Sequence, residues 1–425
     1  MNLSIIKKNF IFYLLFFLPF TIIIGVAITE LVVLIIIVFF FFKNKNIKLF
    51  KNSFFIFLIL ISFYFAINSA VQIQHNDLKI SSIFHWRFAL FSLSIFYFLN
   101  EFKINKKIQN ENILKYFILI LFFIFFDSFF QFFYGENILG YKIISNRISS
   151  VFKDELILGS FLIKILPLFL WLYLLLNNKL KEKYFTTLFL SLYFIVIYLS
   201  AGRTAFALLI FFIFLILITI PNLRKIFIFS FLIMIMFLAF SFFFKIGKSD
   251  PSFRLFTKSF KQITNNAYTN VKNNKKPVQK NFQIFSKAHT GHYILSWDLF
   301  KKNKVFGIGP KGFRDYCRSV NYNPAKGICS THPHNTLVQI FLETGILGGL
   351  VYIFVLIFIL YNCILCLMNK KLDNLKKNSF MLASIAIIIN FFPFLPSGNF
   401  FNNWISIINY YYIGFYIYNY NILKI

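Results

Sequence analysis

The stretch Arg224-Lys-Ile-Phe-Ile-Phe-Ser-Phe-Leu-Ile-Met-Ile-Met-Phe-Leu-Ala-Phe-Ser-Phe-Phe-Phe-Lys245 carries no charge between Lys225 and Lys245. An α-helix needs an apolar run of about 20 residues to cross the hydrocarbon core of a bilayer. Similar runs recur along the whole chain, since 59% of its 425 residues are hydrophobic and its mean hydropathy is +0.72. Both values exceed those of ordinary soluble domains. The sequence therefore predicts an all-α polytopic membrane protein.

About twelve such runs can be recognised, and we expect each to form a transmembrane helix. Their approximate bounds are 9–25, 27–42, 53–68, 82–100, 113–133, 155–176, 184–200, 204–220, 224–245, 336–368, 378–396 and 400–421. The tenth run is the longest, and we expect it to begin with a stretch at the membrane surface. The chain then divides into transmembrane helices 1–9 (1–245), a large periplasmic loop with short helices (246–335) and transmembrane helices 10–12 (336–425).

The orientation follows from the charges of the connecting loops. Lysine and arginine gather in alternate loops, at residues 7–8, 43–51, 103–107, 179–183, 224–225, 370–377 and 424. Positive residues favour the cytoplasmic side, so we expect both termini there and the loop 246–335 outside. Lys7 and Lys8 precede an apolar run that has no small-residue cleavage site, which favours a retained first helix. The histidines then all lie on or near the outer face: His75, His85, His289, His292, His332 and His334.

The large loop has two parts of different composition. Residues 246–282 are rich in Lys, Asn and Ser, and we expect them to be mobile or partly ordered. In the second part, the pattern over 293–300 predicts a short amphipathic helix, and a glycine turn follows over 307–312. Such a turn can present backbone N–H groups to a phosphate, or it can simply join two helices. The net charge of +30 does not indicate nucleic-acid binding, because the sequence has no soluble basic face or fold.

Two cysteines, Cys317 and Cys329, share the large loop. An oxidising periplasm permits a disulfide between them, which would contribute about 3 kcal/mol in the loop-entropy model. A zinc site formed by these cysteines with His332 and His334 is the alternative, although its spacing is not a standard one. Cys363 and Cys366 lie inside a predicted span, where we interpret them as packing residues.

The segment Cys329-Ser-Thr-His-Pro-His-Asn335 leads into the tenth run. His332 and His334 flank Pro333, which favours extended backbone, so we expect their side chains to point to different faces. Asn335 can cap the helix that follows. A neutral His334 at the helix entrance could accept a proton from a sugar hydroxyl, or it could be an interfacial histidine that only supports the cap.

Taken together, these residues resemble the O-antigen ligase family of bacterial envelope glycosyltransferases. The family pattern is a His followed by Asn, nine residues, Gly, two residues, and Gly or a similar residue. This chain has His334, Asn335, Gly345 and Gly348 at that spacing.

Three further elements look like the same superfamily, so that the resemblance spans about residues 120–350. The first is Asp127-Ser-Phe-Phe-Gln131 with Gly135, then Arg147-Ile-Ser-Ser-Val-Phe152 and Gly159. The second is Ser200-Ala-Gly-Arg203-Thr, and the third is Trp297 leading into Gly307-Ile-Gly-Pro-Lys-Gly-Phe313.

The resemblance implies an inverting, metal-independent transfer of a glycan from undecaprenyl pyrophosphate to lipid A-core, at the periplasmic face of the bacterial inner membrane. The expected partners are this donor, this acceptor and membrane lipids, with no cofactor. The large loop has only Asp250, Asp298 and Asp315 as acidic residues and no pair of aspartates for a metal.

The family uses two outer-face arginines and one loop histidine. Arg203 matches the first arginine and His334 matches the histidine. The second arginine usually precedes the Trp, where this chain has Thr290-Gly-His292. His292 is therefore the third catalytic candidate, with Arg147, Arg254, Arg314 and Arg318 as alternatives. Arg147, Asn335, His332, Arg314, Gly309 and Gly312 are expected to bind substrate.

Other residues and other functions stay open at this point. Arg87 and Asp127 lie inside predicted spans, where ionisable residues are functional or pair between helices. Glu343 can pair with an arginine or with the glycine turn, or act directly. The same superfamily includes O-antigen polymerases, which extend the lipid-linked glycan. A polysaccharide transporter or flippase would predict inverted repeats and broken helices in matching halves, which the sequence does not show.

Overall fold

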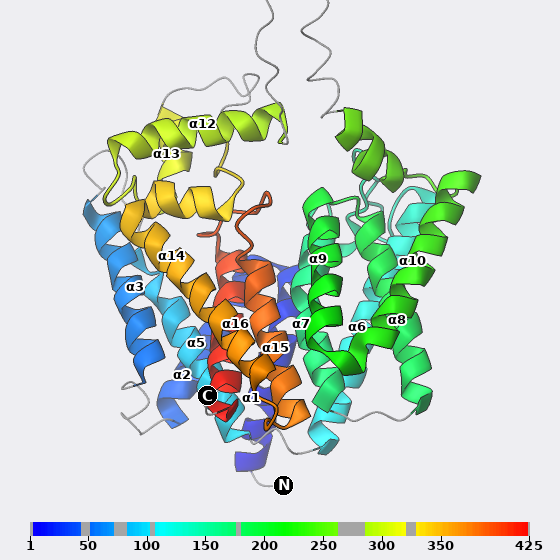
Figure 1. Ribbon diagram of the computed structural model, residues 1–425, viewed down its shortest axis with the longest axis horizontal. Coiled ribbons are helices and arrows are strands. Elements are labelled where there is room, and N and C mark those ends of the chain that lie inside the picture. Colours follow the sequence, from blue (N-terminus) through cyan, green and yellow to red (C-terminus); the bar gives the residue numbers. More distant parts are fainter. Residues whose placement is uncertain are drawn as a thin grey trace, which may run out of the picture. The chain divides into compact units, whose positions relative to one another are not determined.

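The computed structural model describes residues 3–43, 52–71, 83–102, 107–175, 180–261, 285–319 and 329–423. Within these ranges all regular structure is helical, apart from two isolated β-bridges in the segment 136–147 (Figure 1). Each predicted apolar run coincides with one helix, which confirms the all-α class. His75 and residues 262–282 of the segment expected to be mobile lie outside the described residues.

Six of the described helices are long and apolar enough to cross a membrane. They are Val26–Lys43, Ser53–Ala70, Asn112–Tyr134, Leu158–Leu175, Pro221–Phe244 and Thr336–Met368. Phe10–Ile24, Lys183–Leu199 and Arg203–Thr219 are shorter apolar helices. These helices confirm a multi-pass membrane protein, whereas twelve crossings and a periplasmic loop stay predictions.

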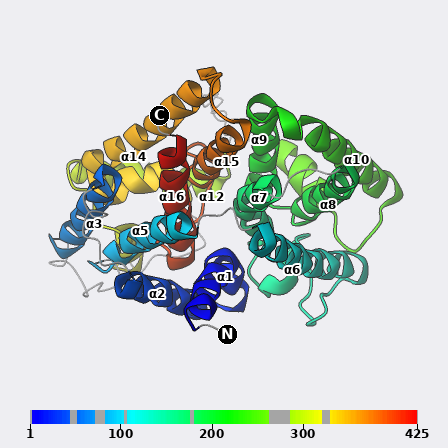
Figure 2. The ribbon, with the colours of Figure 1, turned by 90° about the horizontal axis from the view of Figure 1, so that it is seen from below.

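The chain forms two compact units, and the first consists of Met1–Gln109 and Lys287–Ile425. Its helices are α1 (Leu3–Ile24), α2 (Val26–Lys43), α3 (Ser53–Val71), α5 (Trp86–Glu101), α12 (Lys287–Lys302), α13 (Gly312–Ser319), α14 (Thr336–Met368), α15 (Asn374–Asn390) and α16 (Asn403–Leu423). In this unit α16 packs against both α5 and α15, while α12 packs on α14 (Figure 2). Unit 1 thus unites the N-terminal helices with the loop segment that carries the histidines.

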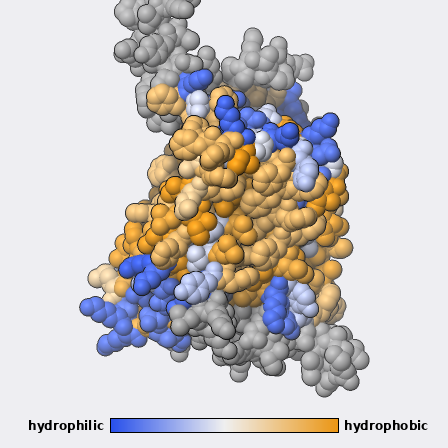
Figure 3. Space-filling view, turned by 90° about the vertical axis from the view of Figure 1, so that its right-hand side faces the viewer, coloured by the Kyte–Doolittle hydropathy of each residue, from blue (hydrophilic) through white to orange (hydrophobic). Residues whose placement is uncertain are grey.

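The second unit is Asn110–Ser286. It contains α6 (Lys107–Tyr134), whose first residues precede the unit boundary, α7 (Leu158–Leu175), α8 (Leu180–Leu199), α9 (Arg203–Thr219) and α10 (Arg224–Phe244), with the short helices η3 (Ser150–Phe152), η4 (Pro221–Leu223) and η5 (Phe253–Thr257). The outward side of α10 exposes Phe229, Met236 and Phe243, among other apolar side chains. Figure 3 shows an apolar band with hydrophilic side chains at its ends, as a lipid-facing surface requires.

Helix α14 is broken at Gly345, whose backbone is not helical (φ +67°, ψ −169°). Only glycine adopts such a positive φ without a steric penalty. The segment 336–344 lies across the bundle of unit 1, and the longer segment after the break runs along the side of this bundle (Figures 1 and 2). The tenth run thus begins with a separate short segment, whereas the place of this segment at the membrane surface stays a prediction.

The glycine turn at Gly307 is hydrogen-bonded to the backbone on both sides of this break. The Ile308 N–H donates to the Leu342 carbonyl over 2.9 Å, and the Ile346 N–H donates to the Lys304 carbonyl over 2.8 Å. A Cβ on Gly345 would lie 2.0 Å from the Val305 carbonyl oxygen, and a Cβ on Gly307 would lie 2.5 Å from the Gly345 nitrogen. The two backbones can approach this closely only because both residues are glycines.

Helix α3 donates hydrogen bonds to one carbonyl group at the break and to one beside the glycine turn. The Tyr64 hydroxyl donates to the Thr344 carbonyl over 2.6 Å, and the Asn68 amide donates to the Phe306 carbonyl over 2.6 Å. Away from water an unpaired carbonyl is costly, so these two side chains stabilise the broken geometry.

Replacing Gly345 by alanine should destabilise the protein strongly, because the new Cβ meets the Val305 carbonyl and the positive φ is also strained. We expect a loss of about 3 kcal/mol or more, measured by thermal unfolding in detergent. Gly140→Ala is the matched control. Gly140 also has a positive φ (+83°), but nothing lies within 4 Å of its Cβ position, so the cost should be about 1 kcal/mol. Equal losses in both variants would contradict the interlocked contact.

Candidate functional site

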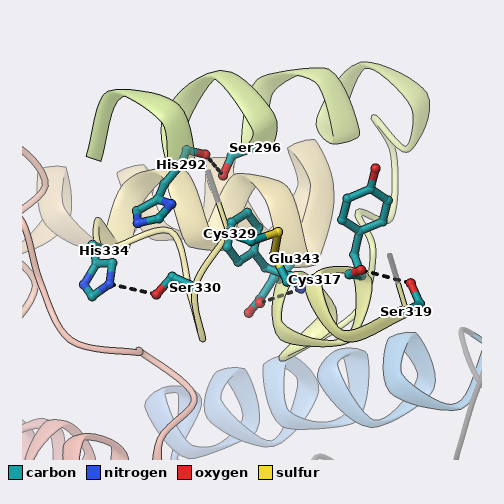
Figure 4. The surroundings of a disulfide bond; sticks show 10 residues. His292, Ser296, Cys317, Ser319, Cys329, Ser330, His334 and Glu343 are labelled. Carbon is teal, nitrogen blue, oxygen red and sulfur yellow. Dashed lines mark hydrogen bonds between the residues drawn. A yellow bond between two sulfur atoms is a disulfide. The ribbon is translucent and has the colours of Figure 1, made fainter. Parts of the chain in front are cut away.

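Four histidines gather where α12 passes over the loop that precedes α14. The ring centroid of His334 lies 4.0 Å from that of His332, 5.4 Å from His292 and 5.3 Å from His289. Figure 4 shows the His292 ring on α12 directed towards His334. Among the residues that the structure describes, no group of three or more His, Cys, Asp or Glu side chains has the arrangement of a metal site.

The expectation that His332 and His334 point to different faces is wrong. His334 adopts a left-handed backbone conformation (φ +59°), which turns its ring back towards His332. A positive φ is unusual for a non-glycine residue and is held by surrounding contacts. Here the Ser397 N–H donates to the His334 carbonyl over 3.0 Å, and Nε2 of the His334 ring lies 2.9 Å from the Ser330 hydroxyl (Figure 4).

Both loop histidines are strongly biased towards the neutral form. Burial, followed by the charges of His332, His289 and His292, lowers the pKa of His334 to about 3. Burial also lowers the pKa of His332 to about 4. Nε2 of His332 lies 3.1 Å from the Ser397 carbonyl, which can only accept, so this nitrogen carries the proton. A neutral imidazole keeps one ring nitrogen that can accept a proton.

Asn335 caps α14 as expected, since its side-chain oxygen accepts from the Val338 N–H over 3.0 Å. Its amide group meanwhile donates to the Pro393 carbonyl over 2.8 Å. The loop between α15 and α16 is thereby fastened to the helix start. A hydrogen bond of 2.8 Å between the hydroxyls of Thr336 and Ser397 strengthens this attachment. No pattern in the sequence indicated that residues 393–400 would support residues 329–335, the loop that carries His332 and His334 (the histidine loop).

A buried polar chain underlies this start of α14. Glu343 is fully buried, and its carboxylate accepts from the Phe313 N–H over 3.3 Å and from the Gln339 amide over 2.9 Å. Gln339 also donates to Asn399 over 2.8 Å and accepts from the Phe400 N–H over 2.9 Å. Of the two expected partners of Glu343, the glycine turn is thus the one it contacts.

The turn 307–313 uses several of its backbone N–H groups in hydrogen bonds within the protein. The N–H groups of Gly307, Ile308, Gly312 and Phe313 donate to Asn303, Leu342, Gly309 and Glu343 respectively. These four donors are occupied within the protein, which favours a turn that joins two helices over a phosphate cradle. Its role is to place α13 beside α14.

A disulfide joins Cys317 on α13 to Cys329 at the start of the histidine loop, with a Cα–Cα distance of 5.5 Å (Figure 4). Cysteines in a disulfide cannot act as thiolate ligands, so this bond excludes the alternative zinc site with His332 and His334. It tethers the loop to the turn 307–313 through α13, whose Phe313 is fully buried. Cys363 and Cys366 are free and buried, in agreement with a packing role.

Unit 2 carries a separate cluster of three half-buried arginines around the turn between α8 and α9. Arg147 donates from Nη2 to the Leu156 carbonyl over 2.5 Å and from Nε to the Ser200 carbonyl over 3.4 Å. Nε of Arg254 donates to the Ala201 carbonyl over 3.2 Å, and Nε of Arg203 to the Arg254 carbonyl over 3.4 Å. Burial and then the like charge of Arg254 lower the pKa of Arg147 to about 10. Three guanidinium groups close together favour binding of an anion with several oxygens.

Helix α6 explains the Asp127 and Gln131 pattern. The Asp127 carboxylate accepts from the Ile138 N–H over 2.9 Å and from the Ser150 hydroxyl over 2.6 Å. The Gln131 side-chain oxygen accepts from the backbone N–H of Ser150 over 2.8 Å. These bonds hold the segment that presents Arg147, so the two side chains have a structural role here.

Gly159 has a similar role, because a Cβ at this position would lie 2.2 Å from the Ser200 hydroxyl. The absence of a side chain lets α7 approach the turn that precedes Arg203.

The remaining candidates lie in unit 1. Arg314 on α13 has a buried Nε without a hydrogen-bond partner among the described residues, whereas Arg318 on the same helix is exposed. Arg87 on α5 pairs with Glu30 on α2 over 2.9 Å, in agreement with a pair between helices. His289 and Gln339 were missed by sequence reasoning. The only available signal was that His289 lies one helical turn before His292.

Asn335→Ala should cost about 2 kcal/mol of stability, because it removes a helix cap and the bond to the Pro393 carbonyl together. The measurement is thermal unfolding in detergent, and the loss of the monodisperse species is the readout. Asp373→Ala is the matched control, since Asp373 caps α15 by accepting from the Lys376 N–H. It should cost about 1 kcal/mol. An equal or smaller loss for Asn335→Ala would contradict the double role.

Acidification should destabilise unit 1 between about pH 6.5 and pH 4. Unfolded histidines bind protons near pH 6.5, whereas folded His332 and His334 resist protonation until about pH 4 and 3, so the unfolded state takes up more protons in this window. His332→Gln keeps a donor for the Ser397 carbonyl but does not titrate. It should lose less stability than the wild type on going from pH 7 to pH 4.5, by on the order of 2 kcal/mol. Parallel stability curves for the two proteins would refute this assignment.

Comparison with known proteins bears on the four histidines and on Arg203 and Arg254. Residues 187–353 match the family described as O-antigen ligase. A protein of Rickettsia prowazekii (strain Madrid E), provisionally named polysaccharide ligase, is 31% identical over 106 residues, which are 25% of this chain and 23% of that protein. A provisionally named polysaccharide ligase of Rickettsia felis is 35% identical over 74 residues, or 17% of this chain. These alignments span 23% and 16% of the two relatives. The resemblance of this chain to the O-antigen ligase family is thereby confirmed over residues 187–353.

Proposed function

We propose that this protein transfers a glycan from undecaprenyl pyrophosphate to lipid A-core at the periplasmic face of the bacterial inner membrane. The observation that carries the proposal is the histidine loop. Its strained, neutral His334 is held by Ser330 and Ser397 at the start of a family-matched helix. The relatives named as polysaccharide ligases support the class of reaction.

The proposed orientation follows the charge pattern of the loops. Both termini lie in the cytoplasm, and residues 246–335 form a periplasmic segment between transmembrane helices 1–9 and 10–12. Lipid-linked donor and lipid acceptor then reach the protein from the membrane, and no metal or cofactor takes part in the reaction.

The arginine cluster binds the diphosphate of the donor in this proposal. Guanidinium groups match pairs of phosphate oxygens, and the like charges of Arg147, Arg203 and Arg254 are relieved when an anion binds. Arg254 fills the role of the family's second arginine better than His292 does, because its side chain shares the turn of Arg203. His292 then supports the ring of His334.

His334 serves as the base for the acceptor. The acceptor hydroxyl oxygen forms a bond to the anomeric carbon while the bond from that carbon to the diphosphate oxygen breaks. The hydroxyl proton passes to His334, undecaprenyl pyrophosphate leaves with the electron pair, and the anomeric configuration inverts. A pKa of about 3 makes His334 a weak base in the free protein.

The remaining candidates complete the site in this proposal. Arg314, whose buried Nε is open to an acceptor, and His332 contact the acceptor. Asn335 holds the loop, and Gly309 and Gly312 shape the turn beside it.

Reconstituted protein should transfer glycan from undecaprenyl pyrophosphate to lipid A-core in vitro. His334→Ala and Arg203→Ala should each lower the rate by about 100-fold or more, because they remove the base and the anion contact. Arg224→Ala is the matched control, since Arg224 also donates to a backbone carbonyl but lies at the other end of α9. It should retain the wild-type rate. Longer lipid-linked glycan without transfer would identify a polymerase instead, and full activity of His334→Ala would remove the proposed base.

A further inference from the structure

A short helical segment over residues 251–261 follows α10 in unit 2 and exposes three phenylalanines. Phe253, Phe256 and Phe260 are 41%, 47% and 68% exposed, whereas Ser252 and Leu255 are buried. The segment therefore has one face against the protein and one largely exposed apolar face. An exposed cluster of large apolar side chains marks contact with a partner or with a membrane.

The protein face of this segment is fixed beside the arginine cluster. The Ser252 hydroxyl lies 2.6 Å from the Tyr198 hydroxyl. Nε of Arg254 donates to the Ala201 carbonyl over 3.2 Å, and the Arg254 carbonyl accepts from Nε of Arg203 over 3.4 Å. These bonds determine which face of the segment is turned to the protein and which face is left exposed.

The exposed face continues a surface that is suited to lipid. α10 belongs to a helix that is long and apolar enough to cross a membrane, and its last residues Phe243 and Phe244 are exposed. The segment begins seven positions after α10 ends (251 − 244). Its Phe256 contacts Phe206 in the first turn of α9, with 6.0 Å between the ring centroids. Figure 1 shows the segment beyond the upper ends of α9 and α10, where a membrane-spanning bundle meets the membrane surface.

Positive charge flanks this apolar face. Lys245, Lys248, Lys258 and Lys261 are all exposed, and Asp250 is the only acidic residue between positions 245 and 261. Helices that lie in the membrane interface combine an apolar face with lysines whose ammonium groups reach the lipid headgroups. A basic cluster next to a span favours anionic lipid. A second copy of this chain would bring the same positive charge, so charge complementarity favours lipid over self-association.

We propose that residues 251–261 form a helix in the membrane interface. Phe253, Phe256 and Phe260 lie among the acyl chains, and the flanking lysines contact the headgroups of anionic phospholipids. The partner is bilayer lipid and not a substrate, so the inference does not depend on the proposed reaction. A helix this short is marginal by itself in water, and contact with lipid stabilises it. Because Arg254 belongs to the same segment, the arginine cluster then lies at the level of the headgroups.

The test places an environment-sensitive fluorophore on a cysteine at position 260 of the full-length protein, in bilayers of phosphatidylcholine with phosphatidylglycerol. Phe260→Cys is compared with Phe243→Cys as the lipid reference and Asp154→Cys as the aqueous one, since both reference positions are exposed. The parent protein corrects for labelling of the buried Cys363 and Cys366. Phosphatidylcholine that carries a nitroxide on its acyl chain should quench the label at 260 at least about half as strongly as at 243. Aqueous iodide should quench it about fivefold less than at 154.

The same label tests the headgroup. Phosphatidylglycerol with a nitroxide should quench it at least about twofold more than phosphatidylcholine with the same nitroxide. Lys258→Ser combined with Lys261→Ser should abolish this difference. Lys225→Ser is the matched control, because it removes an exposed lysine at the other end of α10, and it should keep the difference.

Iodide quenching at position 260 as strong as at 154 would overturn the inference, because the apolar face would then lie in water. Weak quenching by both iodide and the nitroxide lipids would also overturn it, since another part of the chain or a second copy would then cover the face. Equal quenching by the two lipids without the lysine substitutions would refute the role of anionic headgroups.

Discussion

The close contact between the backbones of Gly307 and Gly345 is the constraint on which the geometry of unit 1 depends. A side chain at either position would collide with the opposite backbone. The contact lets α14 break after one short segment, and it aligns that segment with α12 and α13. Without the break, the residues before Gly345 would continue the axis of the long helix, and Asn335 could not reach the carbonyl of Pro393. Gly345, which belongs to the family spacing in the sequence, is therefore required by the backbone geometry of the fold.

In each of the two units, polar loops lie next to apolar helices. Water is scarce there, so an open backbone group must find a partner within the protein. In unit 1, Tyr64 and Asn68 of α3 supply partners for the break, and Gln339 and Glu343 supply them for the loops beside it. In unit 2, Asp127 and Gln131 do the same for the segment that bears Arg147. In each case a buried polar side chain on a helix fixes a loop that carries the candidate functional groups.

The helices could be predicted from the sequence because a span of apolar residues has few structural options in a membrane. The cap at Asn335 could also be predicted, since a cap depends on residues within one turn. The ring orientation of His334 could not, because its left-handed backbone is imposed by Ser397, which lies 63 positions further along the chain (397 − 334). The grouping of Arg254 with Arg203 likewise depends on a turn that no local pattern specifies. Sequence reasoning therefore identified candidate functional side chains, whereas hydrogen bonds between residues far apart in the sequence determine how those side chains are oriented.

The central claim is that the histidine loop and the arginine cluster serve one glycan transfer. The most direct measurement is a cryo-electron microscopy structure of the protein in nanodiscs with a non-transferable lipid-linked glycan. The account predicts diphosphate density on Arg147, Arg203 and Arg254, with the anomeric carbon facing the ring of His334. Density for the diphosphate away from these arginines, or a glycan that leaves His334 without a substrate neighbour, would contradict it.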